Sequence, residues 1–328
     1  MKNTLWISLA LLFVLVFVLD ILFGSIHIPL AEFKAVLQGS DSVYTDIIRD
    51  LRLPKAITAV LAGCALSVAG LLLQTYFRNP LAGPDVLGIS AGAGLGVALL
   101  LMSSAFLPAA VMLSGWGLVA SAVFGAVGVM LVVIAVSLRL RSAVSLLIVG
   151  IMIGSICGSL IAVLQNLSNP DTLKIYVVWT FGSLASVTWS YLQMMFPLIL
   201  LGLLSVLVLA KPLNALLLGE QNAQSLGVPI HFTRTAIVAV AALLTGVTTA
   251  FTGPIAFIGI AVPHLARGLF RTSDHRALLP ATMLCGALLM LVCDIITQLP
   301  GGGQTLPVNS VSALFGAPVV IWVILRKK

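Results

Sequence analysis

Few residues of this sequence could carry acid–base chemistry inside its apolar segments. Asp20 and Asp294 fall near the ends of apolar runs, and His264 follows Pro263 inside another. Ionisable side chains within membrane segments mark proton or ion pathways by default. A proton relay needs a chain of acids or histidines across the bilayer, however, and these three are isolated in the sequence. We therefore favour a structural role for His264, in which it bonds backbone carbonyls that the proline leaves free.

Neither metal nor nucleotide chemistry is indicated by the motifs. The four cysteines lie inside apolar runs without C-x-x-C spacing, which is typical of buried packing thiols: Cys64, Cys157, Cys285 and Cys293. No G-x-x-x-x-G-K-[ST] phosphate loop occurs, and the glycine-rich stretch Gly301–Gln304 lacks the lysine. We expect a non-catalytic chain that binds no metal and no cofactor of its own.

The composition is that of an integral membrane protein. The chain has 328 residues, of which 60% are hydrophobic and 8% charged, and its mean hydropathy is +1.17. Soluble domains carry about 25% charged residues. A single transmembrane domain over residues 1–328, surrounded by membrane lipid, accounts for the whole chain. The net charge of +7 comes from scattered basic residues rather than a block, which argues against nucleic acid.

The apolar runs define the number of spans. A helix needs about 20 apolar residues to cross the hydrocarbon. By this measure there are ten candidates: Leu5–Phe23, Ala56–Tyr76, Val86–Leu107, Trp116–Leu138, Val144–Leu164, Tyr191–Leu209, Thr235–Phe251, Ile255–Phe270, Leu278–Thr297 and Val308–Leu325. The eighth is short and broken, so nine is the alternative. A topology of ten spans puts most Lys and Arg residues on the same side of the membrane as both termini. The positive-inside rule assigns that side to the cytoplasm. The predicted fold is an all-α polytopic membrane protein.

One long polar segment, Lys211–Arg234, interrupts the second half of the chain. Pro212 and Pro229 bracket it, Gly219 divides it into two short helix-sized pieces, and Gly227 closes the second piece as a helix C-terminus would. The pattern predicts a compact helix-turn-helix displayed outside the membrane, which could receive force from a separate motor protein. A simple interfacial loop between two spans is the alternative.

Two candidate spans carry glycine at every fourth position. These stripes are Gly88, Gly92 and Gly96 in the third span, and Gly150, Gly154 and Gly158 in the fifth. Such stripes let helix backbones approach closely within lipid, so tight packing is the favoured interpretation. The alternative is a smooth wall along a wide translocation path.

A short internal echo suggests a repeated architecture. The segment Gly83–Ile89 resembles Gly253–Ile260 with one residue inserted. The two lie on opposite sides of the membrane in the predicted topology, five spans apart, as an inverted repeat requires. Inverted repeats are typical of transporters.

At Arg78–Ala93 the sequence resembles the permeases of type II, FecCD-type ABC importers, which move cobalamin, haem and ferric siderophores. The likeness continues, in family order, at Leu51–Lys55, Leu218–Gly227, Gly253–Arg267, Asp274–Pro280 and Leu314–Trp322. The resemblance implies a ten-span subunit in a bacterial inner membrane that dimerises around a central path. It also implies two ATPase subunits inside, which hold ATP and magnesium, and a substrate-binding protein outside that makes most of the choice of cargo.

The resemblance places site residues at the cytoplasmic side. The coupling helices fall at about 212–228, with the ATPase contacts at Leu218, Gly219, Glu220, Ala223, Leu226 and Gly227. An inner gate is implied at Asn79, Leu81, Ser142, Ala143 and Val144. For Ala143 and Val144, an ordinary turn remains the alternative.

Three cations precede the second span on the side where the positive-inside rule disfavours them: Arg49, Arg52 and Lys55. We expect them to pair with carboxylates of a docking protein, and Arg52 and Lys55 match the family positions that do so. Gln298 departs from relatives that have arginine there. In the alternative interpretation, the cations only balance Asp46 and Asp50 in a solvated segment.

Two other classes share some of these features. A self-contained secondary transporter or channel would use His264, Asp294 and Asp20 for ions, and a membrane scaffold would transport nothing. The polar segment Lys211–Arg234 and the lack of a clustered ion site favour the importer permease. Whether it pairs with itself or with a paralogous permease stays open, although a homodimer is our expectation.

Overall fold

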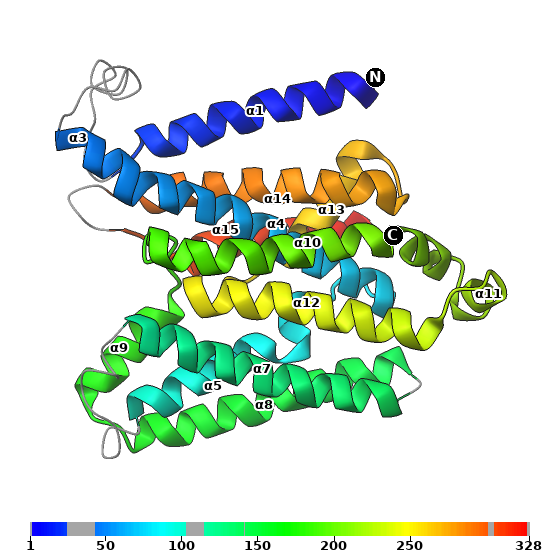
Figure 1. The fold of residues 1–328 in the computed structure, drawn as a ribbon, viewed down its shortest axis with the longest axis horizontal. Coiled ribbons are helices and arrows are strands. Elements are labelled where there is room, and N and C mark those ends of the chain that lie inside the picture. Colours follow the sequence, from blue (N-terminus) through cyan, green and yellow to red (C-terminus); the bar gives the residue numbers. More distant parts are fainter. Residues whose placement is uncertain (1, 25–42, 103–114, 141, 301–304, 327–328) are drawn as a thin grey trace.

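The computed structural model of the chain describes residues 2–24, 43–102, 115–140, 142–300 and 305–326 (Figure 1). The glycine-rich stretch Gly301–Gln304 and the end of the expected third span lie outside that description. Within it, no residue lies in a β-strand, so the all-α prediction is confirmed.

Each expected span has a helix at its position. The elements follow in chain order: α1 (Lys2–Leu22), α3 (Val43–Asp46), the π-helical η1 (Ile47–Arg52), α4 (Leu53–Phe77), the 3-10 turn η2 (Pro84–Leu87), α5 (Ile89–Met102), α7 (Gly115–Arg139), α8 (Ala143–Asn166), α9 (Pro170–Thr180), α10 (Trp189–Leu217), α11 (Glu220–Ser225), α12 (Ile230–Thr252), α13 (Ile258–Phe270), α14 (His275–Thr297) and α15 (Val308–Arg326). Within the described ranges, seven helices are long and apolar enough to cross a membrane, and α5, α13 and α15 are shorter apolar helices.

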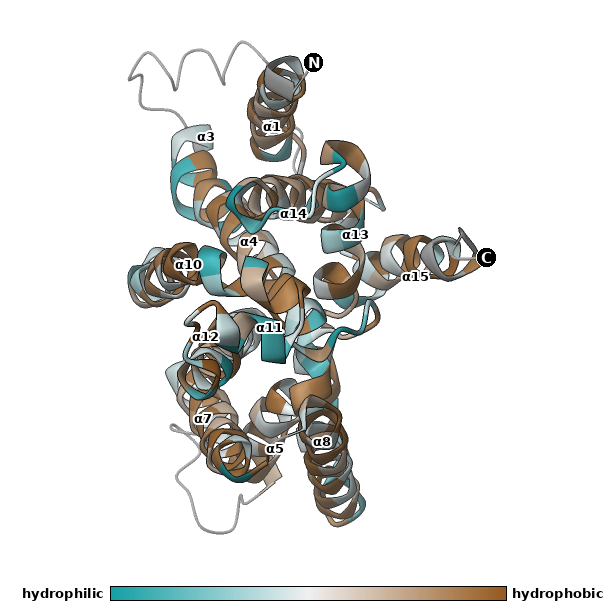
Figure 2. Cartoon of the chain, turned by 90° about the vertical axis from the view of Figure 1, so that its right-hand side faces the viewer, coloured by the Kyte–Doolittle hydropathy of each residue, from teal (hydrophilic) through white to brown (hydrophobic). Residues whose placement is uncertain are grey.

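The helices run between two ends of the molecule. The chain termini and α11 lie at one end, and α3 and α9 lie at the other (Figure 1). We call these the α11 end and the α9 end. Viewed from the α11 end, α4 lies in the middle of the bundle and contacts α10, α12, α13 and α14 (Figure 2).

Burial follows from this arrangement. The apolar window of α4 is 83% buried inside the protein, whereas those of α1 and α8 are each 17% buried. A helix that is apolar on all sides is stable either in a protein core or in lipid. The outward faces of α1 and α8 therefore match a hydrocarbon environment, and α4 forms the core.

The two echo segments both precede short, discontinuous helices. α5 begins at Ile89 rather than at the expected Val86, because Gly88 adopts a left-handed φ of 73° that ends the preceding turn. α13 begins at Ile258, directly after Phe257, whose φ is 67°. Equivalent breaks in the two halves are a feature of inverted-repeat transporters.

These breaks meet beside the central helix. A Cβ atom on Gly259 would lie 2.3 Å from Pro84 Cδ, so the start of α13 packs directly on the first echo segment. A Cβ on Gly70 of α4 would lie 1.8 Å from the Gly259 carbonyl oxygen. Only glycine at both positions permits this backbone approach, which holds the broken helices against α4.

Candidate functional site

The polar segment forms a hook at the α11 end. The hook, residues 218–229, contains α11 and is bounded by Gly219 and Gly227, whose φ values are 108° and 83°. The prediction of a separate helix before Gly219 was wrong, since α10 continues to Leu217 with Pro212 inside it. Buried Leu213 and Leu216 keep this turn packed on the bundle, and that packing outweighs the hydrogen bond lost at the proline.

An ion pair closes the hook onto the next helix. Arg234 Nε donates to Glu220 Oε1 over 3.2 Å, and its Nη2 donates to Glu220 Oε2. Arg234 is buried and Glu220 is partly exposed, so the pair lies at the edge of the protein. Ala223 is the buried residue of α11. A bidentate, charge-assisted contact of this kind fixes orientation as well as distance.

Three large apolar side chains are exposed on or beside the hook, among exposed polar residues. Leu218 is 63% exposed, Leu226 is 64% exposed, and Phe232 at the start of α12 is 71% exposed. Gln221, Gln224 and Ser225 are exposed between Leu218 and Leu226, and protein–protein interfaces combine apolar anchors with polar residues in this way. This surface is therefore suited to a partner protein.

Polar contacts fasten the base of the hook to neighbouring helices. Arg78 Nη2 donates to the Leu216 carbonyl over 3.1 Å. Asn214 Nδ2 donates to Asp274 Oδ1 over 2.6 Å, and Asn214 Oδ1 accepts the backbone N–H of His275 over 2.8 Å. The backbone N–H of Arg276 and the Asn214 amide hold the pKa of Asp274 below its usual range. α10 and α14 are thereby joined just where α10 leads into α11.

Part of the expected gate adjoins the hook. A groove of about 550 Å³ is lined by Ser142, Ala143 and Val144 together with Leu218–Asn222. Ser142 caps α8, its side chain accepting the Ser145 N–H over 3.3 Å. Asn79 and Leu81 do not line this groove. They form their own turn, in which Asn79 Oδ1 accepts the Leu81 N–H over 3.0 Å.

The glycine stripes have different surroundings. Cβ atoms on Gly92 and Gly96 would meet α7, the first 2.7 Å from the Gly125 carbonyl oxygen and the second 2.0 Å from that of Ser121. A Cβ on Gly88 would lie 2.9 Å from the Gly150 carbonyl oxygen, and Gly154 is also close to Gly88. Gly158 has no atom within 4 Å of its Cβ position. Five of these glycines therefore lie at helix contacts, and Gly158 faces open space.

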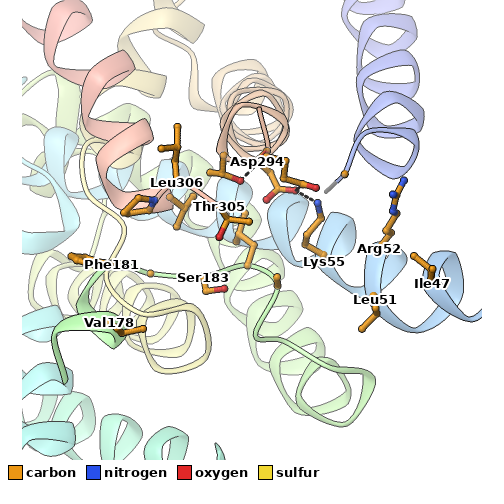
Figure 3. Close-up of a pocket in the computed structure, with 18 residues that line it drawn as sticks. Ile47, Leu51, Arg52, Lys55, Val178, Phe181, Ser183, Asp294, Thr305 and Leu306 are labelled. Carbon is orange, nitrogen blue, oxygen red and sulfur yellow. Dashed lines mark hydrogen bonds and ion pairs between the residues drawn. The ribbon is translucent and has the colours of Figure 1, made fainter. Parts of the chain in front are cut away.

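A second candidate region, the outer hollow, lies at the α9 end. It has a volume of about 460 Å³, and its lining includes Lys55, Asp294, Ser183 and Thr305 (Figure 3). Lys55 points toward Asp294, while Arg52 points toward the end of α1 (Figure 3). Charged and hydroxyl groups from four separate segments thus converge here.

Of the three cations expected to bind a docking protein, only Arg49 is exposed. Arg52 and Lys55 are each 6% exposed, because carbonyls and carboxylates of the chain itself surround them. Arg52 Nη1 donates to the Ile21 and Leu22 carbonyls, each over 2.7 Å, at the end of α1. Asp46 and Asp50 form no ion pair with these cations in the described part of the chain.

The expectation that Asp20 and Asp294 are isolated is also wrong. Lys55 Nζ lies 2.7 Å from Asp294 Oδ2 and 4.0 Å from Asp20 Oδ1, so α1, α4 and α14 each contribute one ionisable group. We call these three residues the charge cluster. His264 reaches a carbonyl outside its own helix: its Nε2 lies 2.7 Å from the Pro80 carbonyl oxygen, in the turn after α4.

Arg78 and Arg234 belong to the site, although the sequence analysis did not identify either of them as a site residue. Arg78 has a left-handed φ of 49° at the end of α4, and nothing in the local sequence indicates this. Arg234 had a usable signal, because its charge is opposite to that of Glu220 at the two ends of the polar segment. No sequence signal indicated the charge cluster, since its three members are far apart along the chain.

A bundle of apolar helices with two broken helices and an extramembrane hook defines a multi-pass membrane permease. The chain belongs to the FecCD transport family, whose profile matches residues 11–326. It is 36% identical over 329 residues to the vitamin B12 import system permease protein BtuC of Klebsiella pneumoniae, covering 100% of this chain and 95% of the relative. The BtuC of Salmonella typhimurium is 35% identical over 327 residues, covering 99% and 96%.

Solved structures agree with this assignment. A metal-chelate type ABC transporter in an inward-facing conformation superposes with a TM-score of 0.84 at 29% identity, covering 100% of both chains. PsaBC from Streptococcus pneumoniae, solved with a Fab, shares the fold at a TM-score of 0.55 and 15% identity, covering 89% of this chain and 94% of that one. The chain is thus a permease of an ABC importer, and the alternatives of a secondary transporter and a scaffold fall away.

Proposed function

We propose that this chain is the membrane subunit of an ATP-driven importer that moves a corrinoid or a large metal chelate such as a ferric siderophore or haem. Two copies form a homodimer in a bacterial inner membrane, with the α11 end and both termini in the cytoplasm. A separate pair of ATPase subunits binds the α11 end. A substrate-binding protein delivers cargo to the α9 end.

The hook is the observation that supports this proposal most directly. It presents Leu218 and Leu226 to solvent, Phe232 is exposed beside it at the start of α12, and the Glu220–Arg234 pair fixes the hook to α12. A loop that only joined two spans would gain nothing from an exposed apolar surface on a rigid support. A motor subunit that binds there could transmit a displacement through α10 and α12, because the hook connects these two core helices.

The surface that best supports a translocation path between two copies of the chain lies on α8. Ser155 and Ser159 are exposed, and each satisfies its hydroxyl on its own helix, bonding the Ile151 and Ser155 carbonyls, each over 3.0 Å. With Gly158 they form a small, smooth face that demands no specific polar partner. Such a surface suits either a wide path or the neighbouring copy.

The names of the relatives support the choice of cargo to test first. The two BtuC relatives are vitamin B12 permeases, and the closely superposing structure is of the metal-chelate type. Cobalamin is itself a metal chelate of large size, so a corrinoid is the first substrate to test.

The test is reconstitution into proteoliposomes with candidate ATPase and substrate-binding proteins from the same organism. Labelled cobalamin, haem and a ferric siderophore are offered in parallel, with and without ATP. We expect ATP-dependent uptake of one of the three and co-purification of the ATPase. Absence of any ATPase association would overturn the motor assignment, and uptake without ATP would overturn the importer mechanism.

A further inference from the structure

The charge cluster contains one ammonium group in contact with two carboxylates. Lys55 Nζ is 2.7 Å from Asp294 Oδ2 and 4.0 Å from Asp20 Oδ1, and the exposed fraction of Asp20 is 0%. Neither Asp20 oxygen has a hydrogen-bond donor in the described part of the chain. If both carboxylates were ionised, the cluster would hold an excess negative charge in a dry environment.

One neighbouring cation, Arg52, attracts the Asp20 carboxylate, but less strongly than Lys55 does. The titratable or charged side chains facing the cluster come from η1, α4 and α14: Arg52, Lys55, Cys293 and Asp294. Arg52 directs its Nη1 at the Ile21 and Leu22 carbonyls. Gln298 Nε2 donates to Asp294 Oδ2 over 3.3 Å, so Asp294 has two donors, and Asp20 has none.

A buried carboxylate without donors is strongly unfavourable as an anion, and it becomes neutral by binding a proton. A carboxylic acid is also a donor, so a protonated Asp20 could hydrogen-bond Asp294. We propose that Asp20 carries a proton in the resting protein, and that the charge cluster is a proton-binding site that fastens α1 to α4 and α14. This proposal does not depend on the importer function.

The position of the cluster gives the proton a structural role. α1 is largely exposed along its length, and it contacts chiefly α14. At the α9 end of the molecule, α1 is held by the charge cluster and by the hydrogen bonds that Arg52 donates to the last carbonyls of α1. Loss of the proton would set two negative charges against one ammonium and loosen this attachment. Lys55 and Asp294 also line the outer hollow, which gives the site a route to the medium at the α9 end.

Infrared spectroscopy of the permease alone, in lipid nanodiscs near neutral pH, tests the protonation state. We expect a carbonyl band of a protonated carboxylic acid that shifts in D₂O. It should be lost in Asp20→Asn. It should also be lost in Asp294→Asn, because Lys55 would then need the Asp20 carboxylate as its only counter-charge. Asp171→Asn, an exposed aspartate at the same end, and Asp85→Asn, an aspartate that bonds Ser90, are the controls and should retain the band.

Thermal unfolding of the same variants gives an independent readout. Asp20→Asn should unfold close to the wild-type temperature, since a neutral amide replaces a neutral acid. Lys55→Gln should unfold several degrees lower, because the Asp294 carboxylate loses its cation. Absence of a band sensitive to Asp20→Asn overturns the proposal. So does an Asp20→Asn variant that is destabilised as much as Lys55→Gln, which would mean that Asp20 is normally ionised.

Discussion

At the scale of single residues, Glu220 is the counter-charge to Arg234 inside the hook, and the proposed function gives it a second, external role as a contact for the motor subunit. Arg234 is buried, so it depends on this carboxylate more than the carboxylate depends on it. Removing one member of such a pair leaves the other desolvated without a partner. The two roles predict different behaviour for a charge swap.

We expect Glu220→Gln to lower the free energy of unfolding by about 1–2 kcal/mol, at the lower part of the range for charged hydrogen bonds because Glu220 is partly exposed. The swap Glu220→Arg with Arg234→Glu should restore most of that stability. If Glu220 also contacts the motor, the swap will still bind the ATPase poorly. Thermal unfolding and ATPase pull-down measure the two effects.

The control is Gln224→Ala, an exposed change on the same helix that should alter neither quantity. Restored unfolding together with restored binding in the swap would show that Glu220 acts only inside the hook. Unchanged stability in Glu220→Gln would contradict the role of the ion pair altogether.

At the scale of elements, the approach of α13 to α4 depends on two glycines. A Cβ at Gly70 would lie 1.8 Å from the Gly259 carbonyl oxygen, so Gly70→Ala must push the broken helix away from the core. Overpacking of this kind typically costs about 1–3 kcal/mol, and more where backbone atoms clash. We expect a clear fall in the thermal unfolding temperature in detergent. Gly158→Ala is the matched control, because its Cβ would meet nothing within 4 Å. Equal unfolding temperatures for both variants would contradict the close contact.

The gate prediction also belongs to elements, because it concerns the turn between α4 and η2. In a background without the native cysteines, Asn79→Cys should react with a thiol reagent from the cytoplasmic side in one nucleotide state and be protected in another. An exposed position, Arg276→Cys, serves as the control for reagent access. Labelling of Asn79→Cys that is independent of nucleotide would show that this turn is not a gate.

The sequence was most informative about the helices. A helix lies at the position of each predicted apolar run, because crossing a membrane requires a fixed length of apolar helix. The prediction was wrong at α10, where proline and glycine suggested a break before Gly219. The packing of Leu213 and Leu216 instead continues the helix to Leu217. Contacts between distant segments were beyond reach, as the charge cluster shows. Residue type marks a buried charge, but only the tertiary fold supplies its partner.

At the scale of the whole molecule, the two ends differ in chemistry. The α11 end presents the hook, whose exposed leucines lie among polar residues and suit a bound motor. The α9 end presents the outer hollow, whose cations are largely neutralised by the chain itself. Arg49 is the exception among the three expected docking residues, being exposed, with its carbonyl accepting the Trp189 indole N–H over 2.9 Å. Its backbone is thus anchored to the start of α10 while its guanidinium faces solvent.

This difference changes what substitutions at the α9 end should do. Reversing an exposed rim charge mainly changes the association rate and the salt dependence of binding, whereas removing a buried charge changes stability. We therefore expect Arg49→Glu to weaken association with the binding protein and to reduce its sensitivity to salt, without lowering the unfolding temperature. Arg52→Gln should instead lower the unfolding temperature, because the carbonyls at the end of α1 lose their donor.

Surface binding to the purified binding protein at low and high salt, paired with thermal unfolding, separates these outcomes. Lys174→Glu reverses another exposed cation at the same end and controls for a general change in surface charge. Weakening by Arg49→Glu well beyond that by Lys174→Glu would locate the docking contact at η1. Equal weakening would indicate only long-range electrostatics, which are screened beyond about 8–10 Å at physiological salt. Association that neither substitution nor salt alters would place the docking surface away from Arg49, since an ionic contact at the rim must respond to both.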